Sequence, residues 1–308
     1  MKISVVIPLF NENESLPELM SAIASVMKEV TEEYEVLFVD DGSTDDSFQT
    51  CRKLHLEFPL HVRVIRFSRN YGKAAALSAG IEKARGDVII TMDADLQDDP
   101  TAIPAMLDKL DEGYDLVSGW KKKRHDPILS KNIPSKVFNF VVSAMSGVHL
   151  HDFNCGFKAY REETAKSLDI YGERHRFLPA LAHWDRWRVT EIPVTHHPRK
   201  FGKTKYGISR FFNGLLDLIT LLFLRRYLTN PLHFFGLLGL FCFFVGAVVL
   251  GYFGVNWAIT GQMHIRPLTL LSVGAIIVGI QFISIGLIGE MITNSNPNRT
   301  YKIRDFLE

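Results

Sequence analysis

The hydrophobic and polar positions divide the chain into two parts of different character. Over residues 1–200, short β-rich apolar runs alternate with stretches in which apolar residues recur at helical spacing. The predicted strands are Ile3–Ile7, Val36–Val39, Val62–Phe67, Val88–Met92 and Leu116–Val117, and the clearest helical stretches are Leu16–Val30 and Ala74–Ala84. This alternation predicts an α/β domain in which helices cover both faces of a mostly parallel sheet.

Two long runs without a charged side chain follow, Leu232–Ile259 and Leu268–Gly289. About 20 helical residues are enough to cross a hydrocarbon core of about 30 Å. A pair of buried core helices is the alternative, but helices of soluble proteins rarely stay uncharged over such a length. We therefore expect two transmembrane helices, at about residues 232–256 and 268–290.

The basic residues that flank these runs predict their orientation. They are Arg225, Arg226, Arg299, Lys302 and Arg304, whereas the short connection Thr260–Pro267 carries only His264 and Arg266. The positive-inside rule then places both termini on the cytosolic face of the inner (plasma) membrane. The chain opens on a strand pattern and not on a signal peptide, which agrees with a cytosolic N-terminal part.

The segment Ile208–Tyr227 has apolar residues at helical spacing and polar residues on the other side. A core helix would show the same pattern, but the position just before a membrane span favours an amphipathic helix that lies in the membrane interface. We therefore divide the chain into a cytosolic catalytic domain (1–206), a juxtamembrane helix (207–230), two transmembrane helices (231–292) and a cytosolic tail (293–308).

Composition and missing motifs exclude several classes of protein. The chain has 308 residues with 35 Lys+Arg and 34 Asp+Glu, and this balance argues against a nucleic-acid partner. Its three cysteines form no CxxC pair, so a disulfide framework and a structural zinc site are not expected. Neither a P-loop nor a dinucleotide-binding G-x-G-x-x-G follows a predicted strand, so a nucleotide has to be held by other means.

Acidic residues follow three of the predicted strands, in Pro8–Glu14, Asp40–Asp45 and Asp93–Asp99. The carboxyl ends of parallel strands meet at one edge of the sheet, where ligands bind. Asp93 and Asp95 are two residues apart and suit a hard divalent ion, Mg²⁺ or Mn²⁺, that also takes phosphate oxygens. Each loop by itself is more typical of a helix N-cap, but three acidic strand ends together favour a cation site.

Four runs in this order, VVIPLFNENESL, FVDDGSTDDS, RNYGKAAALSAGI and MDADLQDDP, resemble the family-2 glycosyltransferases with a GT-A (Rossmann-like) fold. The later runs FNCGFKAYR and EIPVTHHPRKFGKTKYG, with two C-terminal spans, are similar to the polyprenyl-phosphate glycosyltransferases. These include dolichyl-phosphate mannose synthases and bacterial undecaprenyl-phosphate glucosyltransferases. The two-span layout most resembles the bacterial bactoprenol glucosyltransferase branch.

The resemblance implies roles for particular residues. It places the nucleotide against Pro8, Phe10, Glu12, Val39, Asp41, Asp93 and Ala94. It implies a metal site at Asp93, Asp95 and Gln97, a catalytic role for Asp95, and an orienting or base role for Asp152, for which loop capping is the alternative. It places the phosphates of donor and acceptor against Lys121, Lys131, Ser135, Arg199 and Lys205. Lys121 departs from the family pattern, since members often carry Arg there.

The reaction that the resemblance implies is the metal-dependent, inverting transfer of one hexose from a nucleotide sugar to a polyprenyl phosphate. UDP-glucose or a similar UDP-hexose is the expected donor, and undecaprenyl phosphate in the membrane is the expected acceptor. A phosphate monoester is already a nucleophile, so positioning and charge balance matter more than a strong base. Gln281 and Glu290 in the second span favour an oligomer packed through these helices, and a flippase is a further candidate partner.

Two other functions remain as alternatives. His183–Trp187 resembles the Q-x-x-R-W signature of processive polysaccharide synthases, with His in place of Gln, but such synthases need more than two spans to form a channel. The other alternative is a non-catalytic, nucleotide-sugar-binding membrane anchor, against which the presence of both Asp93 and Asp95 counts.

Overall fold

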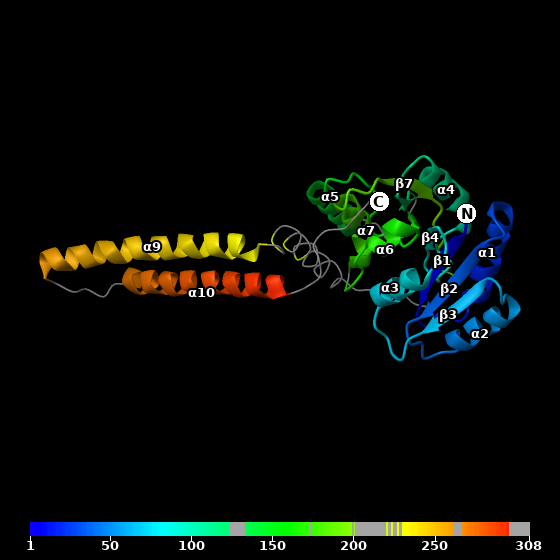
Figure 1. The fold of residues 1–308 in the computed structure, drawn as a ribbon, viewed down its shortest axis with the longest axis horizontal. Coiled ribbons are helices and arrows are strands. Elements are labelled where there is room, and N and C mark those ends of the chain that lie inside the picture. The colour runs from blue at the N-terminus through cyan, green and yellow to red at the C-terminus, as the bar shows by residue number, and fades with distance from the viewer. Residues whose placement is uncertain are drawn as a thin grey trace, which may run out of the picture. The chain divides into compact units, whose positions relative to one another are not determined.

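The computed structural model describes residues 1–122, 133–172, 174–198, 200, 220, 223, 227, 230–261 and 267–295. The chain divides into two compact units, Met1–Asp217 and Leu218–Glu308, and each is described by itself (Figure 1). Most of the predicted juxtamembrane helix Ile208–Tyr227 lies outside the described residues, as do Lys131, Arg199 and Lys205.

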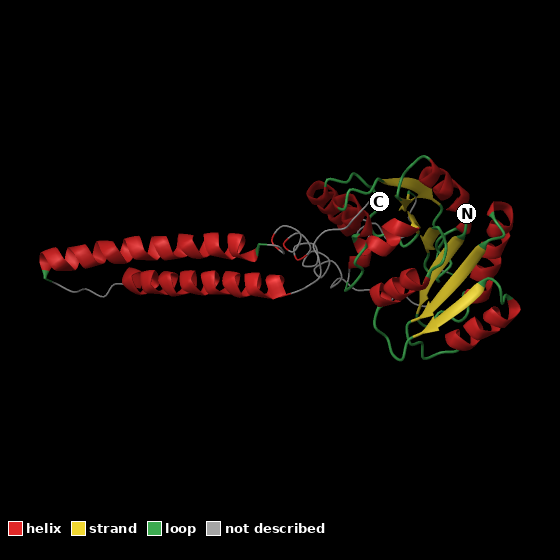
Figure 2. Ribbon diagram, viewed as in Figure 1, coloured by secondary structure: helices red, strands yellow, loops and turns green. Residues whose placement is uncertain are grey.

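A sheet with helices packed around it forms the centre of the first unit (Figure 2). It has seven strands in the order β3-β2-β1-β4-β6-β5-β7. Its strands are β1 (Ile3–Leu9), β2 (Tyr34–Asp40), β3 (Val62–Arg66), β4 (Val88–Thr91), β5 (Leu116–Lys121), β6 (Lys158–Arg161) and β7 (Val189–Val194). Neighbouring strands run parallel except where β6 pairs with β4 and β5, which confirms the predicted mostly parallel α/β fold.

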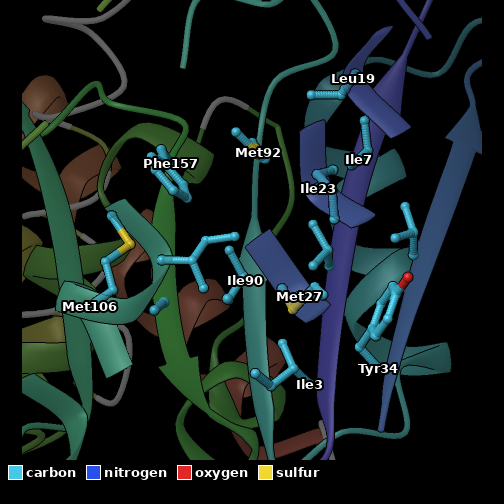
Figure 3. Packing of buried hydrophobic residues seen from close by; sticks show 14 of the residues in the cluster. Ile3, Ile7, Leu19, Ile23, Met27, Tyr34, Ile90, Met92, Met106 and Phe157 are labelled. Carbon is cyan, nitrogen blue, oxygen red and sulfur yellow. The ribbon is translucent and has the colours of Figure 1, made fainter. Parts of the chain in front are cut away.

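Helices cover both faces of this sheet, because successive side chains of a buried strand point to opposite sides. Ile3, Val5 and Ile7 of β1 pack into one apolar cluster, whereas Val6 packs into the other. The first cluster includes side chains of α1 (Leu16–Val30), α2 (Ser47–Glu57) and α4 (Ile103–Asp111), and part of it is shown in Figure 3. The second includes side chains of α3 (Lys73–Lys83), α6 (Glu162–Ser167) and α7 (Leu178–Trp184).

All five strands predicted from apolar runs are present, but β6 and β7 were not predicted. β6 has only four residues, and it begins and ends on a charged side chain, so no apolar run marks it. β7 contains Glu191 and Pro193 and is half-buried over its first residues. The remaining described elements of this unit are α5 (Ile133–Ser146) and the short 3₁₀ helices η1 (Pro100–Ala102) and η3 (Arg174–Arg176).

The second unit is a hairpin of two long helices, α9 (Pro231–Thr260) and α10 (Pro267–Ser295). The two helices touch at glycines: a Cβ at Gly239 would lie 2.6 Å from the Gly279 carbonyl oxygen, and a Cβ at Gly246 would lie 2.6 Å from that of Ser272. Small residues permit this close approach in membrane helices. Both helices are long and apolar enough to cross a membrane, and most of their side chains are exposed. This agrees with the two predicted spans.

A buried polar network lies at the amino ends of the parallel strands, at the edge of the sheet opposite the acidic loops. The Glu35 carboxylate accepts hydrogen bonds from Ser4 Oγ (2.6 Å), Arg63 Nη1 (2.7 Å) and the Arg85 N–H (2.7 Å). Burial by itself would raise the pKa of Glu35, but these bonds and the Arg63 charge outweigh it and lower the pKa below its ordinary value. The carboxylate therefore stabilises the folded state in its ionised form.

We expect Glu35→Gln to lower the free energy of unfolding by about 2 kcal/mol at neutral pH, because bonds to a charged acceptor are lost. The pKa of Glu35 is lower in the folded protein than in the unfolded chain, where it is about 4.3. Glu35 therefore stabilises the folded state fully above about pH 4.3, and this contribution is lost as the pH falls through the folded pKa. The difference between the variants should therefore shrink in acid. Urea unfolding of the full chain in detergent measures it, and the exposed Glu33→Gln is the control. Equal stability of the Glu35→Gln and Glu33→Gln variants at neutral pH would contradict this.

Candidate active site

The carboxyl ends of the parallel strands bring Asp93 and Lys121, two of the predicted site residues, to one edge of the sheet. Asp40 ends β2, Asp93 follows β4 by two residues, and Lys121 ends β5. Lys158 begins β6, and since β6 is antiparallel and Lys158 pairs with Thr91, its first residue lies at this same edge. Ligands of doubly wound sheets bind at such an edge.

The loops after β1 and β2 are tied together by hydrogen bonds. The Asn11 N–H donates to Ser43 Oγ (2.9 Å), the Thr44 N–H donates to Asn11 Oδ1 (2.8 Å), and the Glu12 N–H donates to Ser47 Oγ (2.9 Å). The structure also places Pro8 beside Val39, as paired residues of β1 and β2. The structure thus places Pro8 and Val39 side by side and ties the loop of Glu12 to the loop after β2, where the resemblance expects a nucleotide.

Asp41 holds the loop that leads into α3. Its carboxylate accepts hydrogen bonds from the Tyr71 N–H (2.7 Å) and the Gly72 N–H (2.9 Å). Next to it, Gly42 has φ of 72°, and a Cβ there would lie 2.4 Å from the Arg69 backbone carbon. A cavity of about 590 Å³ opens beside these loops, lined by Gly42, Ser43, Thr44, Arg66, Phe67 and Ser68. Asp41 thus has a structural task besides the base contact that the sequence predicts.

Asp93 lies between a lysine and a glycine. Its Oδ1 accepts a hydrogen bond from Lys73 Nζ, and the side chain remains 31% exposed. On another side, a Cβ at Gly156 would come within 2.7 Å of both carboxylate oxygens. Burial would by itself raise the pKa of Asp93, but the charges of Lys73 and Lys121 hold it well below its usual range. Asp93 is therefore an ionised carboxylate that is open on one side.

Asp98 is a buried carboxylate that the sequence reasoning did not assign. Its Oδ1 lies 3.2 Å from Lys121 Nζ and 3.7 Å from His196 Nδ1, and the backbones of Asp98 and His196 form an isolated β-bridge. Burial by itself would lower the pKa of Lys121, but Asp98 and other carboxylates raise it. Lys121, predicted to contact phosphate, is thus a charged lysine that is already paired with a buried carboxylate.

The turn Asp152–Phe157 supports Asp93 from the β6 side. Thr91 Oγ1 donates to the Gly156 carbonyl (2.8 Å), the Gly119 N–H donates to the Phe157 carbonyl (2.9 Å), and Lys158 Nζ donates to the Cys155 carbonyl. Asp152 is buried, and its Oδ1 accepts from the Asn154 N–H (3.1 Å). Asp152 therefore caps this turn, which is the alternative to the orienting or base role that the resemblance implies.

Lys158 and His175 add two ionisable groups close to Asp93. Burial lowers the pKa of Lys158. Burial, followed by the charges of Lys73 and Arg176, moves the pKa of His175 far below its ordinary value, so His175 is neutral at physiological pH. Lys73 and Lys158 each lie in a run that carries the family resemblance, but the resemblance gives neither lysine a role. His175 lies in none of these runs, and a lone His in the sequence carries no signal.

Asp95 and Gln97 complete the predicted metal-binding loop. The Gln97 N–H donates to Asp95 Oδ1 (3.2 Å), and Gln97 Nε2 donates to the His197 carbonyl (3.4 Å). Among the residues that the structure describes, no three His, Cys, Asp or Glu side chains are grouped so that they could hold a metal alone. Two carboxylates with one open side nevertheless suit a hard divalent ion whose remaining ligands come from a phosphate. Ser135 lies on α5.

Comparison with known proteins identifies both parts of the chain. Residues 4–168 match the glycosyl transferase family 2 domain, and residues 230–295 match the GtrB C-terminal hairpin. The dodecaprenyl-phosphate galacturonate synthase of Rhizobium johnstonii is 39% identical over 96% of this chain and 88% of its own length. The undecaprenyl-phosphate 4-deoxy-4-formamido-L-arabinose transferase of Salmonella choleraesuis is 38% identical over 94% of this chain and 88% of its own length.

Solved structures show the same fold at lower identity. Glucosyl-3-phosphoglycerate synthase from Mycobacterium tuberculosis, in complex with Mn²⁺, UDP and phosphoglyceric acid, superimposes with a TM-score of 0.56 at 19% identity, over 73% of this chain and 78% of that one. The same enzyme with Mg²⁺ and UDP gives a TM-score of 0.54 at 21% identity, over 70% and 79%. The chain belongs to glycosyl transferase family 2, in the branch that carries the GtrB C-terminal hairpin and includes polyprenyl-phosphate sugar transferases.

Proposed function

We propose that this chain is an inverting glycosyltransferase that moves one sugar from a nucleotide sugar to a polyprenyl phosphate. The observation that carries the proposal is the similarity to a dodecaprenyl-phosphate galacturonate synthase over 96% of the chain, which includes both the α/β unit and the helical hairpin. The polar edge of the sheet supports it, because carboxylates for a metal and lysines for phosphate meet there.

On the donor side, Pro8, Phe10, Glu12, Val39, Asp41 and Ala94 line the nucleotide, and Asp93, Asp95 and Gln97 hold Mg²⁺ or Mn²⁺. The fold neighbours that contain Mn²⁺ or Mg²⁺ together with UDP support the use of a divalent ion and favour a UDP-sugar. A bound divalent ion neutralises the negative charge that gathers on the departing diphosphate. Asp93 is well suited to the task, because it is ionised and its carboxylate is partly exposed.

On the acceptor side, an oxygen of the lipid phosphate attacks the anomeric carbon. The new C–O bond forms as the bond between that carbon and the diphosphate oxygen breaks, so the configuration is inverted and the electron pair leaves with the diphosphate. The phosphate is already an anion, and the protein has mainly to align it and balance its charge. Lys121, Lys131, Ser135, Arg199 and Lys205 are proposed to do so. Asp152 orients the acceptor through the turn that it caps.

Two features support a location at the membrane. The helices α9 and α10 are long and apolar enough to span it, and the named relatives act on lipids that a membrane holds. The basic flanks favour an arrangement in which the α/β unit and both termini face the cytosol. The lipid phosphate then lies at headgroup level beside the catalytic unit. An oligomer of this hairpin and a flippase partner remain proposals that follow from the sequence.

The function is tested with purified full-length protein, polyprenyl phosphate, Mn²⁺ or Mg²⁺ and a panel of labelled nucleotide sugars. We expect one of these donors to give a labelled lipid that carries a single sugar. The same assay separates the alternatives, because a processive synthase would yield polymer and a non-catalytic anchor would bind donor without turnover. Absence of a glycosylated lipid with every donor would exclude the proposal.

Asp95→Asn is expected to lower turnover by about 10²–10³-fold, because it removes the charge of one metal ligand at the departing diphosphate. The fold should remain intact, since Asp95 lies in a partly exposed loop at the sheet edge. Steady-state glycosyl transfer and thermal unfolding are measured side by side, with the exposed Asp111→Asn as the control. EDTA should abolish the activity of the parent enzyme. Full activity in EDTA would show that the aspartates serve another purpose.

The two ends of α9 should lie on opposite sides of the membrane. A cysteine placed at Thr260 should react with an impermeant thiol reagent added to intact cells, whereas a cysteine placed at Asn230 should react only after the cells are opened. Both positions are exposed. The native Cys51 and Cys155 are buried, and the partly exposed Cys242 within α9 is replaced by serine in both variants to keep the background low. The reverse labelling pattern would overturn the proposed orientation.

A further inference from the structure

Lys73 and Asp93 form an ion pair at the place where the divalent ion is proposed to bind. Lys73 Nζ donates to Asp93 Oδ1, and the two side chains are 28% and 31% exposed. The pair therefore stands at the surface of the site and can be reached by a ligand. Lys73 has no role in the sequence prediction, although it lies in one of the runs that carry the family resemblance.

The position of Lys73 is fixed by the backbone that precedes it. Lys73 is the first residue of α3, and Gly72 before it has φ of 95°, a conformation that favours glycine. The Asp41 carboxylate holds the N–H groups of Tyr71 and Gly72. The loop after β2 thus determines where α3 starts, and with it where the lysine side chain begins.

Lys121, a second cation beside Asp93, is engaged by a different carboxylate. Lys121 contributes to the low pKa of Asp93, but its Nζ lies 3.2 Å from Asp98 Oδ1. Asp98 is buried and also has His196 within 3.7 Å. The direct hydrogen bond to Asp93 comes from Lys73. Each of the two aspartates is therefore matched by its own lysine.

We infer that Lys73 is the resident counter-cation of Asp93, and that a divalent ion has to displace it in order to bind. The positive charge of Lys73 repels an arriving metal ion, and the ammonium group occupies the Asp93 oxygen that would otherwise bind the ion. The negative charges of a nucleoside diphosphate compensate for both effects, because they neutralise the displaced ammonium and supply further oxygen ligands. Metal and nucleotide then bind together, and the carboxylates hold the ion weakly when the nucleotide is absent. The inference rests on the proposed function and deepens it.

This role differs from that of a lysine that only supports the start of α3. A structural lysine would affect folding and would leave the affinity of the folded protein for metal unchanged. A counter-cation acts through its charge, so an uncharged replacement should strengthen metal binding while arginine should not. The direction in which the metal affinity changes therefore separates the two roles. Loss of a counter-cation strengthens metal binding, whereas damage to the site weakens it.

The experiment is a titration of full-length protein in detergent with Mn²⁺, in which the electron paramagnetic resonance signal reports free Mn²⁺. Wild type should bind Mn²⁺ at least about tenfold more tightly when UDP is present. Lys73→Met and Lys73→Gln should bind Mn²⁺ without nucleotide about tenfold more tightly than wild type, and UDP should then add less. Lys73→Arg should behave like wild type. Lys83→Met removes an exposed charge from the other end of α3 and is the matched control.

Thermal unfolding of each variant shows that the comparison is made on folded protein, and the glutamine variant serves if the methionine variant does not fold. The inference would be overturned if the uncharged variants bound Mn²⁺ no more tightly than wild type. It would also be overturned if UDP did not change the affinity of wild type for Mn²⁺. Metal binding is read without turnover, so the inference can fail while lipid glycosylation succeeds. The proposed function would instead fail in the assay for labelled lipid.

Discussion

Asp93 lies at the end of a strand in the middle of the sheet, where an ionised carboxylate is costly unless an opposite charge lies nearby. Lys73 supplies that charge, and the neighbouring Asp98 is matched in the same way by Lys121. Neighbouring loops hold the Lys73–Asp93 pair in position. The Asp41 carboxylate fixes the start of α3, and the turn before β6 supports Asp93 from the other side. Two carboxylates of the acidic loop after β4 are thus each paired with a lysine, which the acidic sequence of that loop does not suggest.

The antiparallel strand β6 makes this arrangement possible. A parallel strand at its position would place its first residue at the opposite edge of the sheet, far from Asp93. Because β6 runs the other way, Lys158 and the turn before it lie at the carboxyl edge, between β4 and β5. Gly156 in that turn leaves room for the Asp93 carboxylate, since a side chain there would collide with both oxygens. The strand direction and the glycine together leave Asp93 one accessible side.

The helical hairpin follows a different physical rule. Its helices are apolar all round, so the hydrophobic effect in water does not decide which of their faces meet. The contact is formed where Gly239, Gly279 and Gly246 allow the two backbones to approach. Bulky side chains cover the other faces and are exposed, which suits a lipid environment. The α/β unit is organised instead by two apolar clusters on either side of a sheet.

The sequence alone predicted the fold class, the five strands with apolar runs, both long apolar helices and the family, because periodicity and motif order are local properties of the chain. It also placed Asp41, Asp93 and Asp95 after the correct strands. It missed β7 and β6, whose four residues carry charged ends, and it gave no role to Asp98 in the loop of Asp93. It also missed the ionisable partners of Asp93: Lys73, Lys158 and His175. Those partners come from segments far apart in the chain, and only the folded sheet brings their charges together. Burial and charge pairing are properties of that arrangement, so the tertiary structure alone decided which carboxylates are neutralised and which side of Asp93 stays open.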